Sequence, residues 1–272
     1  MLDNLLTFRQ SDGSFLHTED GSGSNQMASE QGFYGLVAAQ RAAEGKSSLY
    51  RMDDVTIRVT GSTGTATVGL PGKDAAVKKQ PITAPGTTFG DIVAHRNQPA
   101  IEALAARGIF NGKGDGLFHP GDTMTRAEFA ATVVRALGLT PKAVTQFTDV
   151  DSSAWYAGYI GTAYTYGIVN GKSETTFDPS GTISRQEAAV MVARAAKLCG
   201  MDTALDAGAI RDILAQFADY VKTAEWAREG LAFCYQEGIL DSSVLEIQGS
   251  TAIARCEIAQ MIFNLLGSAE LL

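Results

Sequence analysis

The chain has little cysteine, histidine and tryptophan and no long apolar run. Its 272 residues include three cysteines, three histidines and two tryptophans. Three scattered cysteines are too few for a disulfide framework or a zinc site, so we interpret them as small buried thiols. No apolar stretch reaches the roughly 18 residues that span a bilayer, and the first residues show no signal-peptide pattern. We therefore expect no membrane insertion.

An excess of positive charge is also lacking. The chain carries 22 lysines and arginines against 30 acidic residues, which gives a net charge of −8. Nucleic-acid binding depends on the neutralisation of phosphates by basic side chains, so we expect no nucleic-acid partner. The histidines lack a metal-ligand spacing, and neither a Gly-x-Ser-x-Gly turn nor a phosphate-binding glycine loop occurs. We predict that the chain is not an enzyme and uses no cofactor.

What the sequence does contain is a threefold repeat. Three predicted apolar helices begin with an arginine two residues before a glutamate, and these arginines are 59 and 70 residues apart: Arg126, Arg185 and Arg255. A Gly-Ile pair precedes each arginine by 17 or 18 residues, and an aromatic-Asp signal opens each unit at Phe89, Phe147 and Phe217. Apolar residues at helical spacing precede each Gly-Ile pair. Each unit therefore reads as helix, glycine-containing loop and second helix.

An arginine at the first position of a helix requires an explanation. Thr125 with Glu128, and Ser184 with its own glutamate, match the capping box, in which hydroxyl and carboxylate each accept a backbone amide of the other residue. The helix dipole disfavours a cation at this position by about 0.3 kcal/mol or more. An anion reverses this, because unpaired amides and an arginine fork both attract a carboxylate. Arg126 is thus well placed for an acidic ligand.

The ordered motifs resemble S-layer homology domains, modules that attach surface proteins to the bacterial cell wall. In the middle unit the likeness is carried by residues 147–150, Trp155, Ile160, 167–171, 177–179 and 183–187, and in the first unit by 108–112, 115–120 and 124–128. It extends from about residue 88 to 267. We divide this stretch into repeats at 88–139, 146–200 and 205–267.

The resemblance implies a mainly α fold, a pseudo-threefold spindle in which the first helices pack together and ligand grooves lie between neighbouring units. It implies a noncatalytic, extracellular module at the cell wall or S-layer surface, associated with peptidoglycan. Its usual ligand is a secondary cell-wall polysaccharide with an acidic, often pyruvylated, amino sugar. The motif arginines are implied to meet the anionic group, and the candidate binding residues are Arg126, Arg185, Arg255, Thr125, Ser184, Lys113, Lys172, Trp155 and Trp226.

A structural role for the arginines is the alternative. Each arginine then pairs with an acidic side chain of the adjacent unit, for example Asp149 or Asp219, and the chain is a structural or protein-interaction module. Lys113 and Lys172 either add charge at the groove rim or are solvated loop residues. Both occupy a position where a calcium loop needs an oxygen ligand, so we expect no metal.

Two further positions leave alternatives open. Trp155 and Trp226 are either core anchors, the interpretation we favour, or flat surfaces for a sugar ring. Arg96 stands at the corresponding position of the first unit. In the third unit Ala254 replaces the capping residue and the loop has lost its Asn-Gly pair, so we expect the site that uses Arg255 to be the weakest or absent.

The first 87 residues differ from the repeats. Residues 25–31 predict a helix start, with Ser29 as a candidate cap, and the amphipathic helix is expected to end near Gly45. Residues 1–50 resemble the last repeat of an α/α-toroid of the prenyltransferase or squalene-cyclase type. One or two helices cannot enclose a toroid's cavity. Residues 51–87 are rich in Gly, Thr, Pro and Lys, and we interpret them as a linker with one short strand at 55–59.

Overall fold

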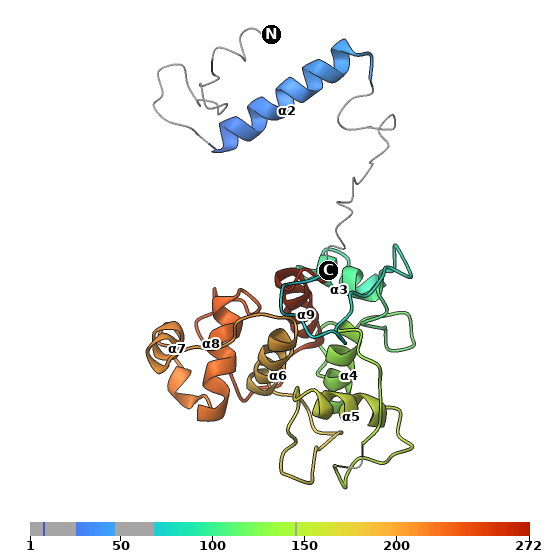
Figure 1. The fold of residues 1–272 in the computed structure, drawn as a ribbon, viewed down its shortest axis with the longest axis vertical. Coiled ribbons are helices and arrows are strands. Elements are labelled where there is room, and N and C mark those ends of the chain that lie inside the picture. Colours follow the sequence, from blue (N-terminus) through green and yellow to red (C-terminus); the bar gives the residue numbers. More distant parts are fainter. Residues whose placement is uncertain (1–7, 9–25, 47–67, 145) are drawn as a thin grey trace. The chain divides into compact units, whose positions relative to one another are not determined.

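The computed structural model describes residues 8, 26–46, 68–144 and 146–272, without the side chains of 26–33 (Figure 1). The expected strand at 55–59 and most of the toroid-like segment lie outside these residues. The chain divides into two compact parts, 1–65 and 66–272, which are described separately. The described residues are helical, with no strand among them, as the mainly α prediction requires.

The first part contains the predicted amphipathic helix. Helix α2 spans Gln26–Ala43, and its end is closed by Gly45 at a φ of 68° and by a hydrogen bond from the Lys46 amide to the Arg41 carbonyl. This is the left-handed C-terminal turn that glycine favours. Ser29 lies inside the helix, so the expectation that it is the N-cap is wrong.

In the second part the three units have the predicted order of elements. Their first helices are α3 (Gln98–Ala105), α5 (Ala157–Thr165) and α8 (Arg228–Gln236), and their second helices are α4 (Arg126–Ala136), α6 (Arg185–Leu198) and α9 (Arg255–Ser268). The glycines that follow the first helices, Gly108, Gly167 and Gly238, have φ of 67°, 67° and 65°. The Gly-Ile pair of each repeat is therefore a helix stop followed by a buried anchor.

One helix of the third unit was not predicted. Helix α7 (Ala207–Leu214) is capped by Asp206, whose carboxylate accepts the Ala209 amide at 2.9 Å, and it packs on α8. An acidic cap followed by apolar residues at helical spacing was the available signal. This helix occupies part of the longer stretch between Arg185 and Arg255.

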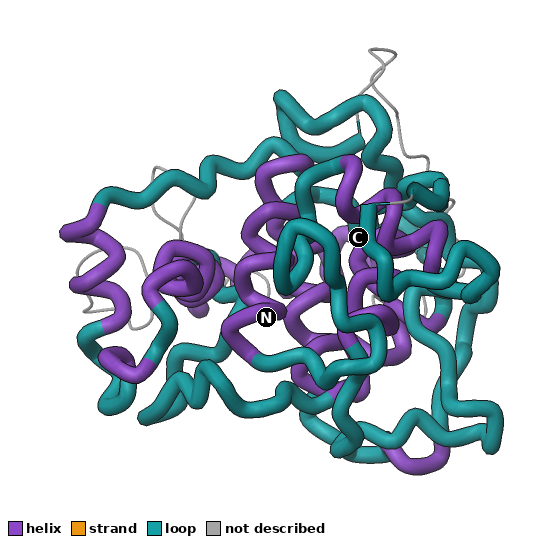
Figure 2. Tube along the Cα trace, turned by 90° about the horizontal axis from the view of Figure 1, so that it is seen from below, coloured by secondary structure: helices purple, strands orange, loops and turns teal. Residues whose placement is uncertain are grey.

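The second helices, not the first, contact one another. Contacts join α4 with α6, α6 with α9, and α4 with α9, whereas each first helix packs on the second helix of the preceding unit, α5 on α4, α8 on α6 and α3 on α9. This corrects the expectation that the first helices pack together. Most residues of α4 are buried, and a helix that is apolar on most sides belongs in the interior. Figure 2 shows the helices in purple, with long teal loops running along the outside of several of them.

Short backbone contacts link the three units into a ring. Each second helix donates its first amide to a loop carbonyl of the next unit: Arg126 to Gly181, Arg185 to Thr251 and Arg255 to Asp122, at 2.8, 3.0 and 2.8 Å. Isolated bridges run beside them, such as Thr125 with Thr182. The third unit thus closes back on the first. A ring of this kind accords with the pseudo-threefold spindle, whose symmetry itself stays a prediction.

Residues 68–87, which the sequence assigned to the linker, lie against the ends of the helices. The Asp74 amide donates to the carbonyl of Leu198, the last residue of α6, and the Lys78 amide donates to the Leu137 carbonyl after α4, at 2.8 and 2.9 Å. Val77 between them is 1% exposed. We call residues 68–84 the strap. Among the described residues, no helix has the length and apolar character needed to cross a bilayer.

Candidate functional site

The three motif arginines sit where the sequence predicted, each as the first residue of its second helix. Arg126 and Arg255 are buried and Arg185 is half-buried. In the ring each arginine reaches into the next unit of the chain, and Arg255 reaches into the first. Each candidate site is therefore built from more than one unit.

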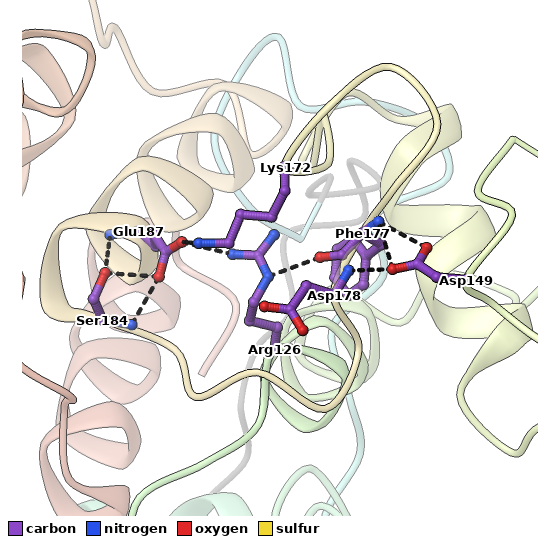
Figure 3. Close-up of polar contacts among 7 residues, drawn as sticks. All are labelled: Arg126, Asp149, Lys172, Phe177, Asp178, Ser184 and Glu187. Atoms are coloured by element: carbon purple, nitrogen blue, oxygen red, sulfur yellow. Dashed lines mark hydrogen bonds and ion pairs between the residues drawn. The ribbon is translucent and has the colours of Figure 1, made fainter.

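Arg126 lies between the loop and the second helix of the middle unit (Figure 3). Its Nε donates to the Phe177 carbonyl, and its Nη1 donates to Glu187 Oε1, both at 2.9 Å. Its guanidinium also lies over the Phe177 ring, 4.8 Å from the centroid. Lys172 Nζ reaches the same carboxylate oxygen at 2.5 Å. Two cations thus share one carboxylate.

The electrostatics of this cluster favour the charged carboxylate. Burial acts to raise the pKa of Glu187, but hydrogen bonds from Lys172 and Ser184, with the nearby charge of Arg126, outweigh it and lower the pKa below its ordinary value. Burial lowers the pKa of the Arg126 guanidinium, against the opposing effect of Glu187. An arginine remains protonated even so.

Arg255 repeats the geometry of Arg126 with a different partner set. Its Nε donates to the Phe118 carbonyl at 3.0 Å, its Nη2 donates to the Asn111 carbonyl at 3.1 Å, and its guanidinium lies 4.7 Å from the Phe118 ring centroid. Among the described residues no carboxylate forms an ion pair with it. Its positive charge is held by carbonyl dipoles and ring faces.

Arg185 forms the most exposed of the three contacts. Its Nη2 donates to Glu257 Oε1 at 2.6 Å, and both side chains retain some exposure. Glu257 is the capping glutamate of α9, as Glu187 is that of α6. In both of these ion pairs the acidic partner of the motif arginine is therefore the capping glutamate of the next unit.

Asp149 and Asp219, the acidic partners considered from the sequence, have another role. The Asp149 carboxylate accepts the amides of Phe177 and Asp178, and Asp219 accepts those of Ile247 and Gln248, at 2.6 to 3.2 Å. The aspartate of the aromatic-Asp motif thus fixes the loop of its own unit through these hydrogen bonds. The expectation that these aspartates pair with the arginines is wrong, because their oxygens are already occupied by loop amides.

The capping boxes are confirmed in two units. Thr125 Oγ1 accepts the Glu128 amide at 3.2 Å, and Ser184 Oγ accepts the Glu187 amide at 3.4 Å, while each glutamate accepts the amide of its cap. In the third unit Glu257 accepts the Ala254 amide, and no hydroxyl is there to return the bond. Both hydroxyls lie at the caps and not on a groove wall.

The helix starts offer an anion fewer free amides than the sequence suggested. In α4 the first amide donates to Gly181, the second to Pro179 and the third to the Thr125 hydroxyl. Buried amides require partners, and the loop of the next unit supplies them. The expectation of unpaired amides at this terminus is therefore wrong, and the positive side chains are what a ligand can meet.

The described residues form three grooves between the units, and we name each by its arginine. The Arg126 groove, of 480 Å³, is lined also by Lys172, Glu187 and Trp226. The Arg255 groove, of 290 Å³, is lined also by Lys113, Glu128 and Trp155. Both grooves combine side chains of all three units. Each has an arginine from one unit, a lysine and a capping glutamate from the next unit, and a tryptophan from the remaining unit.

The tryptophans lie at the groove walls with much of each ring exposed. Trp155 is 57% exposed and Trp226 59% exposed, so the core-anchor interpretation is wrong. Trp155 precedes α5 and makes edge contacts with Tyr156 and Tyr159, and its side chain lines the Arg255 groove. Lys113 Nζ lies 3.5 Å from Asp122, and Lys172 contacts Glu187, so both lysines belong to the grooves as well.

The Arg185 groove, of 930 Å³, departs from the other two. Arg96 stands where they have a tryptophan, and Asp241 to Ser243 replace the Asn-Gly-Lys loop. The loop features lost from the third unit therefore belong to the groove of Arg185. The Arg255 groove is lined by the Asn-Gly-Lys loop of the first unit, because an arginine and the loop it faces come from different units. That the site using Arg255 is the weakest or absent stays a prediction.

Sequence reasoning missed two further cations of these grooves. Arg194 lines the Arg126 groove, and Arg135 lines the Arg255 groove, where its guanidinium lies 4.7 Å from the Tyr159 ring centroid. Each lies nine residues after the motif arginine of its own helix, Arg135 after Arg126 and Arg194 after Arg185. That shared spacing was the available signal. Among the described residues, no three histidine, cysteine or acidic side chains gather as metal ligands.

Comparison with known proteins identifies the first two units. A family model described as the S-layer homology domain matches residues 88–130 and 146–189, so these are S-layer homology domains. The chain is 31% identical over 199 residues to the exoglucanase XynX of Acetivibrio thermocellus, a match that covers 72% of the chain and 17% of that protein. It is 32% identical over 152 residues to the surface-layer 125 kDa protein of Lysinibacillus sphaericus, covering 56% of the chain and 12% of the relative.

A third relative is the middle cell wall protein of Brevibacillus brevis, 39% identical over 103 residues, or 36% of the chain and 10% of that protein. The chain thus spans less than a fifth of each of these relatives.

Proposed function

We propose that the two S-layer homology domains, with residues 205–267 as a third unit of the same kind, form a noncatalytic module that anchors a protein to the bacterial cell wall. The ligand is an acidic secondary cell-wall polysaccharide, whose carboxylate-bearing, possibly pyruvylated, sugars enter the grooves between units. The site of action is extracellular, at the peptidoglycan-associated surface. Relatives named as surface-layer and cell wall proteins support this placement.

The observation that carries the proposal is the charge of two grooves in an acidic chain. The Arg126 groove is lined by three cations and one acid, and so is the Arg255 groove. The chain as a whole carries a net charge of −8. Cations concentrated in a cleft attract an anionic ligand even when the overall charge is negative.

The arginines keep free donors for such a ligand. Arg126 uses Nε and Nη1, and Arg255 uses Nε and Nη2, so one terminal nitrogen of each has no hydrogen bond to a described residue. Together with a groove lysine, that nitrogen can donate to a carboxylate. The exposed ring of Trp226 or Trp155 offers a flat apolar surface to the sugar.

The second candidate is a structural or protein-interaction module. In it the arginines are staples, by which we mean ion pairs that hold neighbouring units together. The Arg126–Glu187 and Arg185–Glu257 pairs, at 2.9 and 2.6 Å, favour it. The two functions differ in one respect. A staple requires only the arginine and its glutamate, whereas a binding groove also requires the exposed lysine and tryptophan, which contribute little to folding.

The experiment is cosedimentation with purified cell-wall sacculi that carry pyruvylated polymer, comparing wild type with Lys172→Ala and Trp226→Ala. Both side chains are substantially exposed, so the variants should fold, as circular dichroism would check. Arg211→Ala is the matched control, because it removes one positive charge outside the grooves. Binding by wild type and the control, with at least fivefold weaker binding by the groove variants, supports anchoring. Equal binding by all four, or none by wild type, favours the staple.

A further inference from the structure

Two of the grooves contain an Asn-Gly pair. Asn170-Gly171 lines the Arg126 groove, and Asn111-Gly112 lines the Arg255 groove. Both asparagines are exposed, and no other asparagine of the chain is followed by glycine. Because glycine has no Cβ to shield its backbone nitrogen, that nitrogen is open to the side-chain carbon of the asparagine before it. Attack of this nitrogen on that carbon is the first step of asparagine deamidation.

The backbone nitrogen after each of these asparagines is free to react. Among the described residues, none accepts a hydrogen bond from the amide of Gly112 or Gly171. Asn97 differs, because it is buried and the amide of the residue after it is hydrogen-bonded. Asn264 lies within α9, where helical hydrogen bonds occupy the backbone amides. Of the described asparagines, only those of the two Asn-Gly pairs combine exposure with a free amide at the next residue.

An arginine contacts a carbonyl of each pair. Arg255 Nη2 donates to the main-chain carbonyl of Asn111 at 3.1 Å. This carbonyl shares a peptide group with the Gly112 nitrogen, so the cation stabilises the anion that forms when the nitrogen loses its proton. In the orientation that satisfies both polar atoms of its amide, Asn170 accepts Arg194 Nη2 on Oδ1 at 3.1 Å. That contact stabilises the negative charge that develops on Oδ1 when the side-chain carbon is attacked.

Packing requires the glycine of each pair. A Cβ on Gly112 would lie 2.8 Å from the Leu117 carbonyl oxygen, and one on Gly171 would lie 2.6 Å from the Phe147 ring. Gly171 also has a φ of 82°, in the left-handed region that other residues rarely adopt. A larger residue that would protect the asparagine therefore does not fit in either loop.

The third unit shows that the loop accommodates a carboxylate at the asparagine position. Asp241 follows Gly238 by three residues, as Asn111 follows Gly108. Its carboxylate is 53% exposed and lies 3.9 Å from a nitrogen of Arg96. An aspartate formed at position 111 or 170 is therefore compatible with the fold.

We propose that Asn111 and Asn170 are sites of spontaneous deamidation, and that the carboxylates formed there weaken anion binding in the two grooves. The glycine amide loses its proton to solvent, and its nitrogen forms a bond with the asparagine Cγ. The Cγ–Nδ2 bond breaks, and Nδ2 takes a proton from water and leaves as ammonia. A second water molecule opens the cyclic imide to aspartate or isoaspartate. Each event replaces a neutral amide by one negative charge.

The added charge is large relative to the charge of a groove. Each of the two grooves is lined by three cations and one acid, so a single event leaves three cations against two acids. In the Arg126 groove the new carboxylate replaces an amide that already contacts Arg194, so this cation becomes ion-paired and less available to an acidic sugar. This consequence rests on the proposed function. It makes the affinity of the module for the wall decline with the age of the protein.

The test for deamidation is incubation of the full folded chain at pH 6 and at pH 8, followed by digestion at low pH and peptide mass spectrometry. We expect Asn111 and Asn170 to convert at least tenfold faster than Asn97 and Asn264. Their conversion should be at least fivefold faster at the higher pH, because the glycine nitrogen must lose its proton. Equal rates at all four asparagines, or no conversion at either pair, would overturn the inference.

Arg194→Gln tests the contribution of the arginine contact. Once circular dichroism shows the variant folded, conversion of Asn170 should be at least threefold slower than in wild type. Asn111 is the internal control, and its rate should stay within twofold. An unchanged or faster rate at Asn170 would exclude Arg194 from the reaction.

The effect on binding is tested by cosedimentation with sacculi. Asn170→Asp supplies the product carboxylate, and Asn170→Gln is the matched neutral control. We expect the aspartate variant to bind at least threefold more weakly than the glutamine variant, and equal binding would overturn the proposed effect. A wild type that deamidates but never binds sacculi contradicts the proposed function alone. A wild type that binds sacculi without deamidating contradicts this inference alone.

Discussion

Glu187 Oε1 lies 2.9 Å from Arg126 Nη1, so the capping carboxylate of one helix is held by the first residue of the helix before it in the ring. The same glutamate accepts two hydrogen bonds from Ser184 through its other oxygen. One side chain therefore joins helix capping within a unit to the contact between units. A change in the cap should therefore also alter the position of Glu187 in the Arg126 groove.

Loss of the Glu187 charge should make the chain less stable, in a pH-dependent manner. Glu187→Gln removes the partner of Arg126 and Lys172, and we expect a loss of about 1–3 kcal/mol at pH 7. The pKa of Glu187 is lowered on folding, so its contribution is present above the ordinary value of 4.5 and is lost as the pH falls through the folded pKa. Urea unfolding at pH 7, 5, 4 and 3 measures this. A wild-type-to-variant difference that stays constant down to pH 3 would contradict it.

A hydroxyl at position 254 should stabilise the third unit. Ala254→Ser supplies the acceptor that the Glu257 amide lacks, and a restored N-cap contributes about 1 kcal/mol. In a domain of this size that corresponds to a rise in Tm of roughly 2–4 °C. Ser184→Ala is the matched control and should lower Tm by a similar amount. Calorimetry with no rise for Ala254→Ser, while Ser184→Ala behaves as expected, would show that α9 cannot use the cap.

The strap should be part of the folded module. Val77 is 1% exposed, and Val77→Ala should cost about 1–3 kcal/mol, because it removes buried methyl groups and leaves a cavity. Ile82→Ala is the control on the same segment, since Ile82 is 56% exposed and should change stability by less than about 0.5 kcal/mol. Guanidinium unfolding compares the two. Equal effects would indicate that the strap is detached in solution.

The His119 ring should titrate above its ordinary value. Its Nε2 lies 2.6 Å from Asp115 Oδ2, and this hydrogen bond raises the pKa of His119 from 6.5. A raised folded pKa means that the stabilisation is fully present below the unfolded pKa and is lost as the pH rises through the folded value. NMR titration of the ring protons measures it, and Asp115→Asn should move the midpoint down. An unchanged midpoint in that variant would exclude Asp115 as the cause.

Much of the local structure was predictable because its signals are local. The capping pairs at Thr125 and Ser184, the helix stops at glycine and the place of each motif arginine depend on residues within about four positions of one another. Helix α7 carried comparable signals in Asp206 and the apolar residues after it, but it has no counterpart in the other units. A comparison among repeats therefore passed over it.

Apart from the misplaced cap at Ser29, the errors concern contacts between distant residues. The tryptophans were expected in the core because an amphipathic aromatic side chain at a helix start is usually largely buried, yet their position at the rim of a groove is set by the neighbouring unit. The free amides expected at the helix starts are occupied by carbonyls more than fifty residues away. No local pattern contains that information.

The sequence by itself determined the three units, their helices and the arginine at each helix start, because capping chemistry and helical periodicity act over a few residues. Only the tertiary structure decided which side chains share a groove. Since each groove takes its arginine, its lysine or loop, and its tryptophan or Arg96 from three different units, the divergent loop of the third unit lines the Arg185 groove and not the Arg255 groove. The physical reason is the ring of contacts, in which loop carbonyls of the next unit accept the first backbone amides of each second helix.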